Sequence, residues 1–347
     1  MSGKNKFRKE IEEFLDANPR VTYFDRQYIL NDHNLERGAD DVLDIIMDFI
    51  DDPKIQTLGC KSTFETGKTS MLKKIIEKCA SQKILCFTHR KHSSKKLYPF
   101  EDLGFVNYLD VEGSLYTYDK VVVHVDSIHR LRASEDSGII FKEYDLVIID
   151  EITNVMHEHA KYPDSGTRFE DMETIMDSAW KVILLDSEFN RIFKILLEKY
   201  EYRLIYNEYD SFRKKFKLSG DKKLFINEIF SLIDSGKNIC LIVDSNAQAK
   251  AFSQLISKVK PDTKQCLHTD EIDLQLNEEH EDVNTYWNQF QVLIYPMIIK
   301  GDADFHIEHF DKMFYASGDA GSDLDYGYFM RTISRIRRLK SGELLVL

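Results

Sequence analysis

The sequence predicts an α/β protein made of two tandem, doubly wound domains with mostly parallel sheets and a helical N-terminal extension. From residue 55 onward, apolar strand-like runs alternate with amphipathic helical stretches, which is typical of βαβ units. A polar segment interrupts the alternation once, and 347 residues are too many for one ordinary core. The expected parts are an extension at 1–52, a first domain at 53–210, a linker at 211–223 and a second domain at 224–347.

Composition and charge narrow the class of protein. The formal net charge of −12 excludes attraction of the whole surface to a polyanion, so contact with nucleic acid needs a local basic strip. The five cysteines are odd in number and scattered, which is typical of reduced core residues. No apolar run approaches the ~18 residues that span a bilayer, and the polar N-terminus does not resemble a signal peptide. We expect a soluble intracellular protein, cytoplasmic or nuclear, with no membrane partner.

The N-terminal extension contains two helix-like stretches, at 6–15 and 39–50. In the second stretch, Val42, Ile46 and Phe49 recur at helical spacing and form the expected buried stripe. We expect the extension to pack on the first domain.

The first strand of the first domain is followed by a candidate phosphate-binding loop. Residues 62–69 read Ser-Thr-Phe-Glu-Thr-Gly-Lys-Thr and lie between an apolar run at 55–60 and an amphipathic helical stretch. Binding a triphosphate takes backbone N–H groups, a lysine for the β- and γ-phosphates and a hydroxyl on Mg²⁺. Gly67, Lys68 and Thr69 supply the end of this pattern, whereas Ser62 replaces its first glycine. The alternative, a chance Gly-Lys-Thr in a turn, is disfavoured by the flanking strand and helix.

A helix that begins near Lys68 would point its N–H groups and its positive dipole end at an anion. We therefore expect ATP as the ligand, bound together with Mg²⁺. The expected ATP-binding residues of the loop are Ser62, Thr66, Gly67, Lys68, Thr69 and Ser70.

A second strand of the first domain ends in two adjacent carboxylates. The apolar run at 144–149 is followed by Asp150 and Glu151. Asp150 at the strand tip would hold Mg²⁺, and Glu151 would polarise the water that attacks the γ-phosphate. Such a strand end is commonplace by itself, but together with the loop it predicts the second half of an ATPase site. The other strands of this domain are expected at 83–88, 120–125, 181–186 and 203–206.

The second domain alternates in the same way. We expect helices at 224–233, 247–259 and 326–337 and strands at 239–243, 290–295, 312–315 and 343–347. Arg335 and Arg338 lie at the end of the last helix, and either could stabilise charge that develops on the γ-phosphate. Alternatively, these arginines are solvated residues that favour the helix C-terminus. The residues alone leave both interpretations open.

Taken in order, these segments resemble those of superfamily 2 helicases, and more closely the herpesvirus-type replication origin-binding helicases and their relatives in large DNA viruses. The resemblance covers roughly residues 28–347. Its most specific segments are the loop at 61–69, Val-Asp-Ser-Ile-His-Arg-Leu at 125–131 and the Asp-Glu segment at 144–152. The chain departs from the family pattern at Arg331, which replaces a Gln, and at Ser334, which replaces a Gly.

The resemblance implies two RecA-like domains that use ATP and Mg²⁺ to move on single-stranded or duplex DNA, with RNA left open and replication proteins as further partners. It implies that Arg335 and Arg338 complete the ATP site, where Lys68 and Glu151 are catalytic and Thr69 and Asp150 hold the metal. Gln27 and Gly301 are further implied ATP contacts. The implied nucleic-acid contacts are Thr88, His89, Arg90, Lys91, Ser127, His129 and Arg130. The alternative is a weakly active or inactive nucleotide-binding scaffold in a replication complex.

Overall fold

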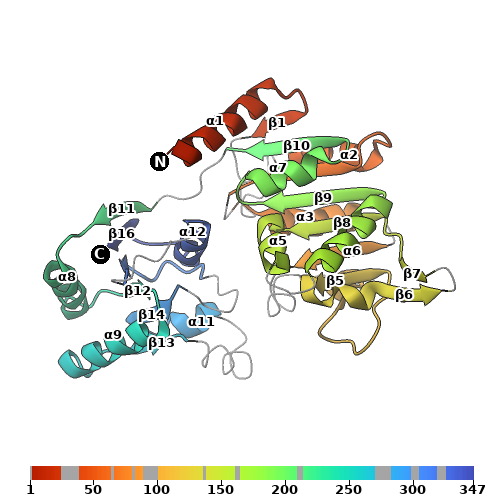
Figure 1. Cartoon of the computed structure of the whole chain (residues 1–347). Coiled ribbons are helices and arrows are strands. Elements are labelled where there is room, and N and C mark those ends of the chain that lie inside the picture. Colours follow the sequence, from red (N-terminus) through yellow and green to blue (C-terminus); the bar gives the residue numbers. More distant parts are fainter. Residues whose placement is uncertain are drawn as a thin grey trace. The chain divides into compact units, whose positions relative to one another are not determined.

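The computed structural model describes residues 2–24, 39–63, 66–79, 83–88, 101–135, 138–160, 165–208, 214–269, 283–297, 305–318 and 326–347. The chain divides into two compact units, Met1–Ser211 and Phe212–Leu347. Each unit contains a parallel sheet with helices on its faces (Figure 1), which confirms the predicted α/β fold class. In the described part of the chain, no helix is both long enough and apolar enough to cross a membrane.

The first unit is built on an eight-stranded sheet in the order β1-β10-β2-β9-β8-β3-β5-β4, and all of its strand pairs are parallel. The strands are β1 (Val21–Phe24), β2 (Thr57–Lys61), β3 (Ile84–Thr88), β4 (Val106–Asn107), β5 (Lys120–His124), β8 (Leu146–Asp150), β9 (Lys181–Asp186) and β10 (Tyr202–Asn207). The helices are α1 (Ser2–Ala17), α2 (Ala39–Asp51), α3 (Lys68–Lys78), α5 (Ile152–Ala160), α6 (Ser165–Ser178) and α7 (Arg191–Glu198), with the short 3-10 helices η1 (Glu101–Leu103) and η2 (Val125–Leu131).

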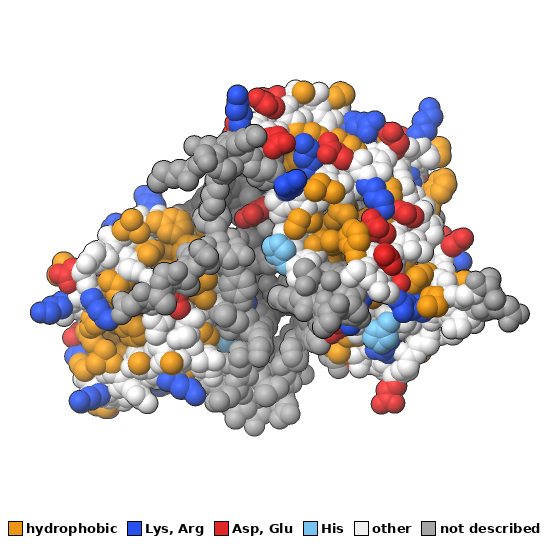
Figure 2. All heavy atoms as spheres, in the orientation of Figure 1, with side chains coloured by type: hydrophobic (Ala, Val, Ile, Leu, Met, Phe, Trp, Pro, Cys, Tyr) orange, Lys and Arg blue, Asp and Glu red, His pale blue; other side chains and the backbone are white. Residues whose placement is uncertain are grey.

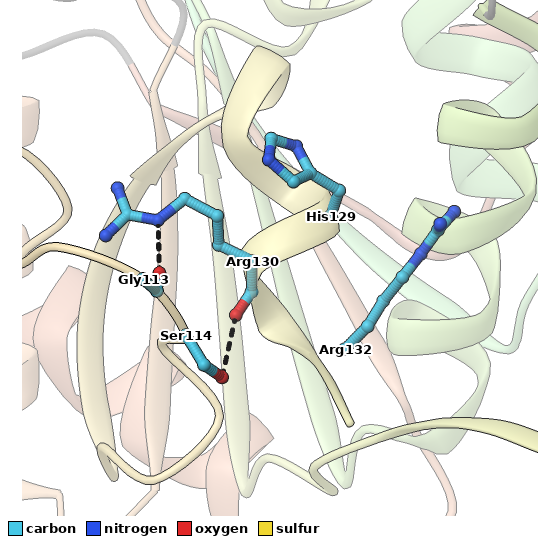
Figure 3. A pocket seen from close by; sticks show the side chains of 5 residues that line it. All are labelled: Gly113, Ser114, His129, Arg130 and Arg132. Carbon is cyan, nitrogen blue, oxygen red and sulfur yellow. Dashed lines mark hydrogen bonds between the residues drawn. The ribbon is translucent and has the colours of Figure 1, made fainter. Parts of the chain in front are cut away.

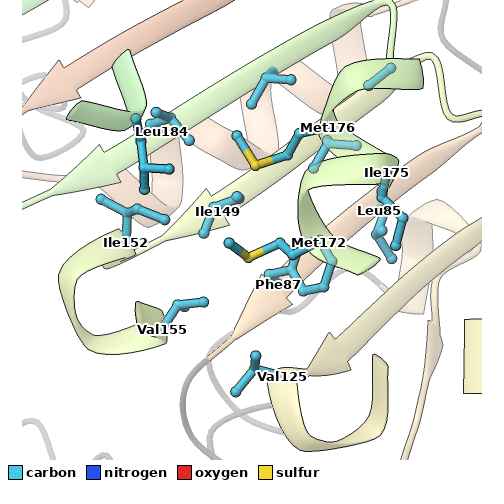
Figure 4. Close-up of a cluster of buried hydrophobic side chains, with 14 of the residues drawn as sticks. Leu85, Phe87, Val125, Ile149, Ile152, Val155, Met172, Ile175, Met176 and Leu184 are labelled. Carbon is cyan, nitrogen blue, oxygen red and sulfur yellow. The ribbon is translucent and has the colours of Figure 1, made fainter. Parts of the chain in front are cut away.

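Two apolar cores cover the two faces of this sheet. On one face, α2 and α3 pack on the strands, and the expected stripe of Val42, Ile46 and Phe49 is buried there. On the other face, α5, α6 and α7 cover a core that includes Phe87, Ile149 and Met172 (Figure 4). Because the central strands are buried on both faces, they read as continuous apolar runs rather than alternating ones.

Leucine side chains from α7 and β10 pack directly on the backbone of β2 at Gly59. A Cβ atom at this position would lie 2.9 Å from Cδ1 of Leu197 in α7 and 3.0 Å from Cδ1 of Leu204 in β10. Such distances are too short for a real Cβ, so a larger residue here would require the side chains of Leu197 and Leu204 to shift on the strand that leads into the phosphate loop.

The second unit has a six-stranded sheet in the order β11-β16-β15-β12-β14-β13, again with parallel pairs. Its strands are β11 (Lys215–Leu218), β12 (Ile239–Val243), β13 (Gln265–Leu267), β14 (Val292–Pro296), β15 (Lys312–Ala316) and β16 (Glu343–Val346). Its helices are α8 (Lys222–Asp234), α9 (Asn246–Val259), α11 (Val283–Trp287) and α12 (Tyr326–Ser334).

The structure differs from the sequence-based expectations at several elements. The extension is not only helical, because β1 forms an edge strand of the first sheet beside β10. Part of the expected linker is the exposed edge strand β11, which pairs with β16. An antiparallel hairpin, β6 (Arg132–Glu135) with β7 (Gly138–Phe141), was not expected. Each of these strands has only four residues, so they lack the long apolar runs from which the other strands were predicted.

The last helix also ends earlier than the expected residue 337. After Ser334 the backbone leaves the helix, because the N–H of Phe305 donates to the carbonyl of Arg335 (2.8 Å) and the N–H of Arg337 donates to the carbonyl of Phe305 (2.9 Å). These hydrogen bonds form a bridge between Phe305 and Ile336. Pairing with a segment about 30 residues earlier thus replaces the last turn of the helix.

Candidate nucleotide site and nucleic-acid strip

The candidate phosphate loop connects β2 to α3 at the carboxyl edge of the first sheet. Gly67, the residue before α3, has φ 90° and ψ 21°, a left-handed conformation in which a Cβ would be strained. No described side chain caps the start of α3. Its first N–H groups and the positive end of its dipole are therefore directed at whatever lies in the loop.

Three hydroxyl and amide side chains are joined by hydrogen bonds inside the loop. The side-chain amide of Asn207, at the end of β10, donates to Oγ of Ser62 (3.0 Å). Ser62 donates to Oγ1 of Thr66 (2.7 Å), and Thr66 donates to the carbonyl of Thr63 (2.8 Å). Ser62, Thr66 and Asn207 are all buried. The serine that replaces the usual glycine thus has a defined structural role in this loop.

The ammonium group of Lys68 is held by the loop itself. Its Nζ donates to the carbonyls of Ser62 (2.5 Å) and Thr63 (3.0 Å). Burial lowers the pKa of Lys68, and the carboxylates of Glu151, Asp150 and Asp186 oppose this effect by favouring the charged form. The lysine therefore lies within the electrostatic field of acids from the ends of β8 and β9.

The two expected carboxylates lie where β8 ends. Asp150 is the last residue of that strand, and Glu151 follows with φ 55°, the only positive φ of a non-glycine residue in the described part of the chain. The amide of Asn154 donates to Oε2 of Glu151, and the carbonyl of Glu151 accepts from the N–H groups of Asn154 and Val155. The first turn of α5 thus holds Glu151, a candidate catalytic residue, in a backbone conformation that costs free energy.

Asp186 is a further acid of this site to which the sequence reasoning gave no role. It ends β9 and is buried, and its backbone carbonyl accepts from the N–H of Ser62 (2.9 Å). Its carboxylate accepts from the N–H groups of Thr153 (2.8 Å) and Glu188 (3.1 Å). The residue therefore joins the start of the phosphate loop to the helix that follows Glu151. An apolar run that ends in an acid, as at Asp150, was the signal that could have identified it.

These groups come together because β2, β8 and β9 are parallel neighbours. The register places Lys61 beside Asp186 and Leu185 beside Asp150. The carboxyl ends of parallel strands form one edge, at which open α/β sheets bind ligands. Asp150 offers the oxygen ligands that Mg²⁺ prefers, and such sites commonly use one or two carboxylates with the substrate phosphates. The described residues contain no group of three or more His, Cys, Asp or Glu that could hold a metal ion.

The described nucleic-acid candidates lie at the ends of β3 and β5. Thr88 is buried at the end of β3, and the hydroxyl of Ser127 donates to Oδ1 of Asp126 (3.0 Å). The guanidinium of Arg130 donates to the backbone carbonyls of Gly113 (2.6 Å) and Tyr108 (2.7 Å) and also to that of Val111. Arg130 thus fixes the loop that precedes β5, a role that the sequence did not indicate.

Beside Arg130 lies an open pocket of about 470 Å³, lined by Gly113, Ser114, His129, Arg130 and Arg132 (Figure 3). His129 is exposed at its rim, and Arg132 forms an ion pair with Asp171 of α6. The guanidinium groups of Arg130 and Arg132 face this pocket already engaged, by backbone carbonyls and by Asp171, so an anion bound there would share them with these partners.

The remaining candidates are placed as follows. Gln27, His89, Arg90, Lys91 and Gly301 lie outside the described residues, and of Thr69 and Ser70 only the backbone, in the first turn of α3, is described. In the second unit, Arg335 is buried at 7% exposure, and Arg338 is exposed. Acidic and basic side chains are interspersed over the first unit in the view of Figure 2.

Comparison with known proteins gives a consistent result. A family model described as "Origin of replication binding protein" matches residues 176–347. A protein of Acanthamoeba polyphaga mimivirus with the provisional name replication origin-binding protein is 31% identical over 92% of this chain. A second mimivirus protein, provisionally named a helicase, is 32% identical over 95% of it. The chain spans only 41% and 32% of the lengths of these two relatives.

Among solved structures, the DEAD-box helicase Mss116 bound to ssRNA and UDP-BeF superposes with a TM-score of 0.57. The match covers 94% of this chain and 76% of that one at 12% sequence identity. At this identity the likeness concerns the fold alone, and it confirms that the two units have the α/β architecture of helicase domains.

Proposed function

This chain belongs with the viral replication origin-binding helicases, and from this relationship we propose that it is an ATP- and Mg²⁺-dependent motor of superfamily 2 that acts on a DNA strand. The observation that carries the proposal is the position of Lys68. Its ammonium group lies in a loop at a helix N-terminus and within the field of three carboxylates from neighbouring strand ends. Such an arrangement suits a ligand that brings both phosphates and a divalent cation.

Each residue has a role in this proposal. Lys68 leaves the loop carbonyls to bind the β- and γ-phosphates, while the first N–H groups of α3 bind the phosphate oxygens. Thr69 and Asp150 hold Mg²⁺, which when bound neutralises charge on the phosphates. Glu151 accepts a proton from the attacking water and orients it, and the amide of Asn154 keeps its carboxylate in place.

Two further parts of the motor are proposed from the family resemblance. Arg335 or Arg338 supplies positive charge to the γ-phosphate as it is transferred. The segments around Arg90 and His129 follow the backbone of the DNA strand, and RNA remains an alternative strand. The basic pocket beside Arg130 supports the second part, because it lies directly next to His129.

Phosphate release from ATP, measured with and without single-stranded DNA, tests the proposal. We expect DNA to stimulate turnover of the wild-type chain and Lys68→Ala to reduce it by at least about 100-fold, because the lysine stabilises developing phosphate charge. Lys78→Ala, an exposed residue in the last turn of the same helix, is the matched control and should behave as wild type. Unchanged turnover in Lys68→Ala would remove the proposed mechanism.

A nucleotide-binding scaffold is the second candidate function, and two observations favour it. Arg331 and Ser334 depart from the family pattern, and Arg335, one of the two proposed arginines, is buried. A scaffold would bind ATP tightly with negligible turnover, and DNA would not stimulate it. The same assay, combined with a binding titration, separates the two functions.

A further inference from the structure

Asn207 contacts the phosphate loop from outside the sequence segments that carry the family resemblance. It is the last residue of β10, its exposed fraction is 0%, and β10 lies beside β2 in the sheet. Its side-chain amide donates to Oγ of Ser62 (3.0 Å), and its backbone carbonyl accepts from Nζ of Lys61 (2.9 Å). One residue of β10 is therefore bonded to both residues at which β2 enters the loop.

The amide gives the hydrogen bonds of the loop a direction. A side-chain NH₂ group can only donate, so Ser62 accepts from Asn207 and directs its own single proton to Thr66 (2.7 Å). Thr66 in turn directs its proton to the carbonyl of Thr63 (2.8 Å). Because each hydroxyl has one proton, the amide donor at one end of the chain and the carbonyl acceptor at the other end impose the same orientation on the bonds between them.

The end of this chain of bonds is the place where Lys68 is held. The carbonyl of Thr63 accepts from both Thr66 and the Lys68 ammonium, and the carbonyl of Ser62 is the second acceptor of that ammonium. The two carbonyls that hold the lysine are thus part of a set of oriented bonds that begins at Asn207. Ordering the loop in advance reduces the entropy that a ligand must remove on binding.

We propose that Asn207 is a positioning residue of the nucleotide site, whose amide orients the hydroxyls of Ser62 and Thr66 and so preforms the phosphate loop for the triphosphate. This inference rests on the proposed ATP-binding function. It also explains the serine in place of the usual first glycine, because glycine at position 62 would interrupt the chain of bonds between Asn207 and Thr66.

The test compares the affinity of the full chain for ATP with Mg²⁺ by titration calorimetry. Asn207→Leu has a similar volume and no hydrogen-bonding group, and we expect it to weaken binding about five- to tenfold, as loss of one oriented bond does. Thr66→Val should weaken binding equally, and Thr66→Ser, which keeps the hydroxyl, should restore it. The double variant Asn207→Leu/Thr66→Val should bind no more weakly than either single variant, because both interrupt one chain.

Thr57→Val is the matched control. Thr57 is buried at the opposite end of β2, so its substitution should leave ATP affinity unchanged. If the wild-type chain binds ATP, then wild-type affinity in Asn207→Leu or additive losses in the double variant would overturn the inference alone. If Asn207→Leu does not fold, Thr66→Val against Thr66→Ser decides, and equal affinities would overturn it. A wild-type chain that binds no ATP would overturn the proposed function and this inference with it.

Discussion

The ammonium of Lys68 is subject to two opposing effects. Burial lowers its pKa from the ordinary value of 10.5, and the carboxylates of Glu151, Asp150 and Asp186 favour the charged form. Because the net effect lowers the pKa of Lys68, the folded chain binds the proton of this ammonium group less tightly than the unfolded chain does. Lys68 therefore reduces stability at neutral pH, and this cost disappears as the pH rises through the window between the lowered pKa and 10.5.

The first prediction follows from this sign. We expect Lys68→Met to lose ATP turnover and yet to melt at the same or a higher temperature than wild type at pH 7.5, because a buried charge is replaced by an apolar chain of similar length. Between pH 8 and pH 10, the melting temperature of the wild type should rise relative to that of Lys68→Met. Thermal melting of both proteins across this range checks the prediction. A difference in melting temperature between Lys68→Met and the wild type that grows with pH contradicts it.

At the scale of single elements, the early end of α12 separates the two candidate arginines. The bridge between Phe305 and Ile336 turns the chain after Ser334, so that Arg335 is buried and Arg338 is exposed. Arg335 acts on the buried Tyr295: burial raises the pKa of that phenol, and the positive charge of Arg335 opposes the rise. We therefore propose Arg338 as the arginine available to a ligand, whereas Arg335 is buried in the second unit.

A pair of substitutions tests this division. Arg335→Ala should lower the melting temperature by several degrees, because it leaves a cavity and removes buried interactions, at a cost of about 2 kcal/mol or more. Arg338→Ala should leave the melting temperature within about one degree and reduce turnover at saturating ATP, as expected for an exposed side chain that acts in the reaction. Melting curves and kcat measured on both variants check this, and a reversed pattern would assign the catalytic role to Arg335.

The elements also show what the sequence could and could not predict. The strands that end at Lys61, Asp150 and Asp186 were predictable, because strands buried on both faces read as long apolar runs, and the loop before α3 has a fixed spacing. The contacts of Asn207 and Arg130 were not, because they depend on β10 lying beside β2 and on the loop at 108–113 folding back. Strand order and loop closure are set by long-range packing, which leaves no periodic signal in the chain.

At the scale of the whole molecule, a net charge of −12 has to coexist with the proposed binding of a polyanion. Figure 2 shows acidic and basic side chains mixed over the first unit in that view, so attraction must come from a few local cations. A motor that neutralises about four phosphates of a single strand loses roughly 50-fold in affinity when the salt concentration rises fourfold. Binding driven by the whole surface would require a different charge balance.

Salt dependence provides the corresponding prediction. We expect the affinity for single-stranded DNA to fall steeply between about 50 and 200 mM salt, and Lys91→Gln to reduce the slope of log K against log salt by about 0.7. Lys9→Gln, an exposed lysine of α1, is the control and should leave the slope unchanged. Fluorescence anisotropy of a labelled oligonucleotide measures both slopes. Affinity that does not depend on salt would exclude a phosphate-tracking strip.

One cysteine of the chain, Cys79 of the first unit, is suited to site-specific labelling with a dye. Cys60, Cys86, Cys240 and Cys266 are buried, and burial raises the thiol pKa of Cys86, Cys240 and Cys266, in the case of Cys240 to about 12. Cys79, which caps the far end of α3, is partly exposed. A maleimide dye should therefore attach to the natural chain at this one position, about 16 Å along the helix from Lys68. Its emission would then follow occupancy of the loop in real time without engineered labelling sites.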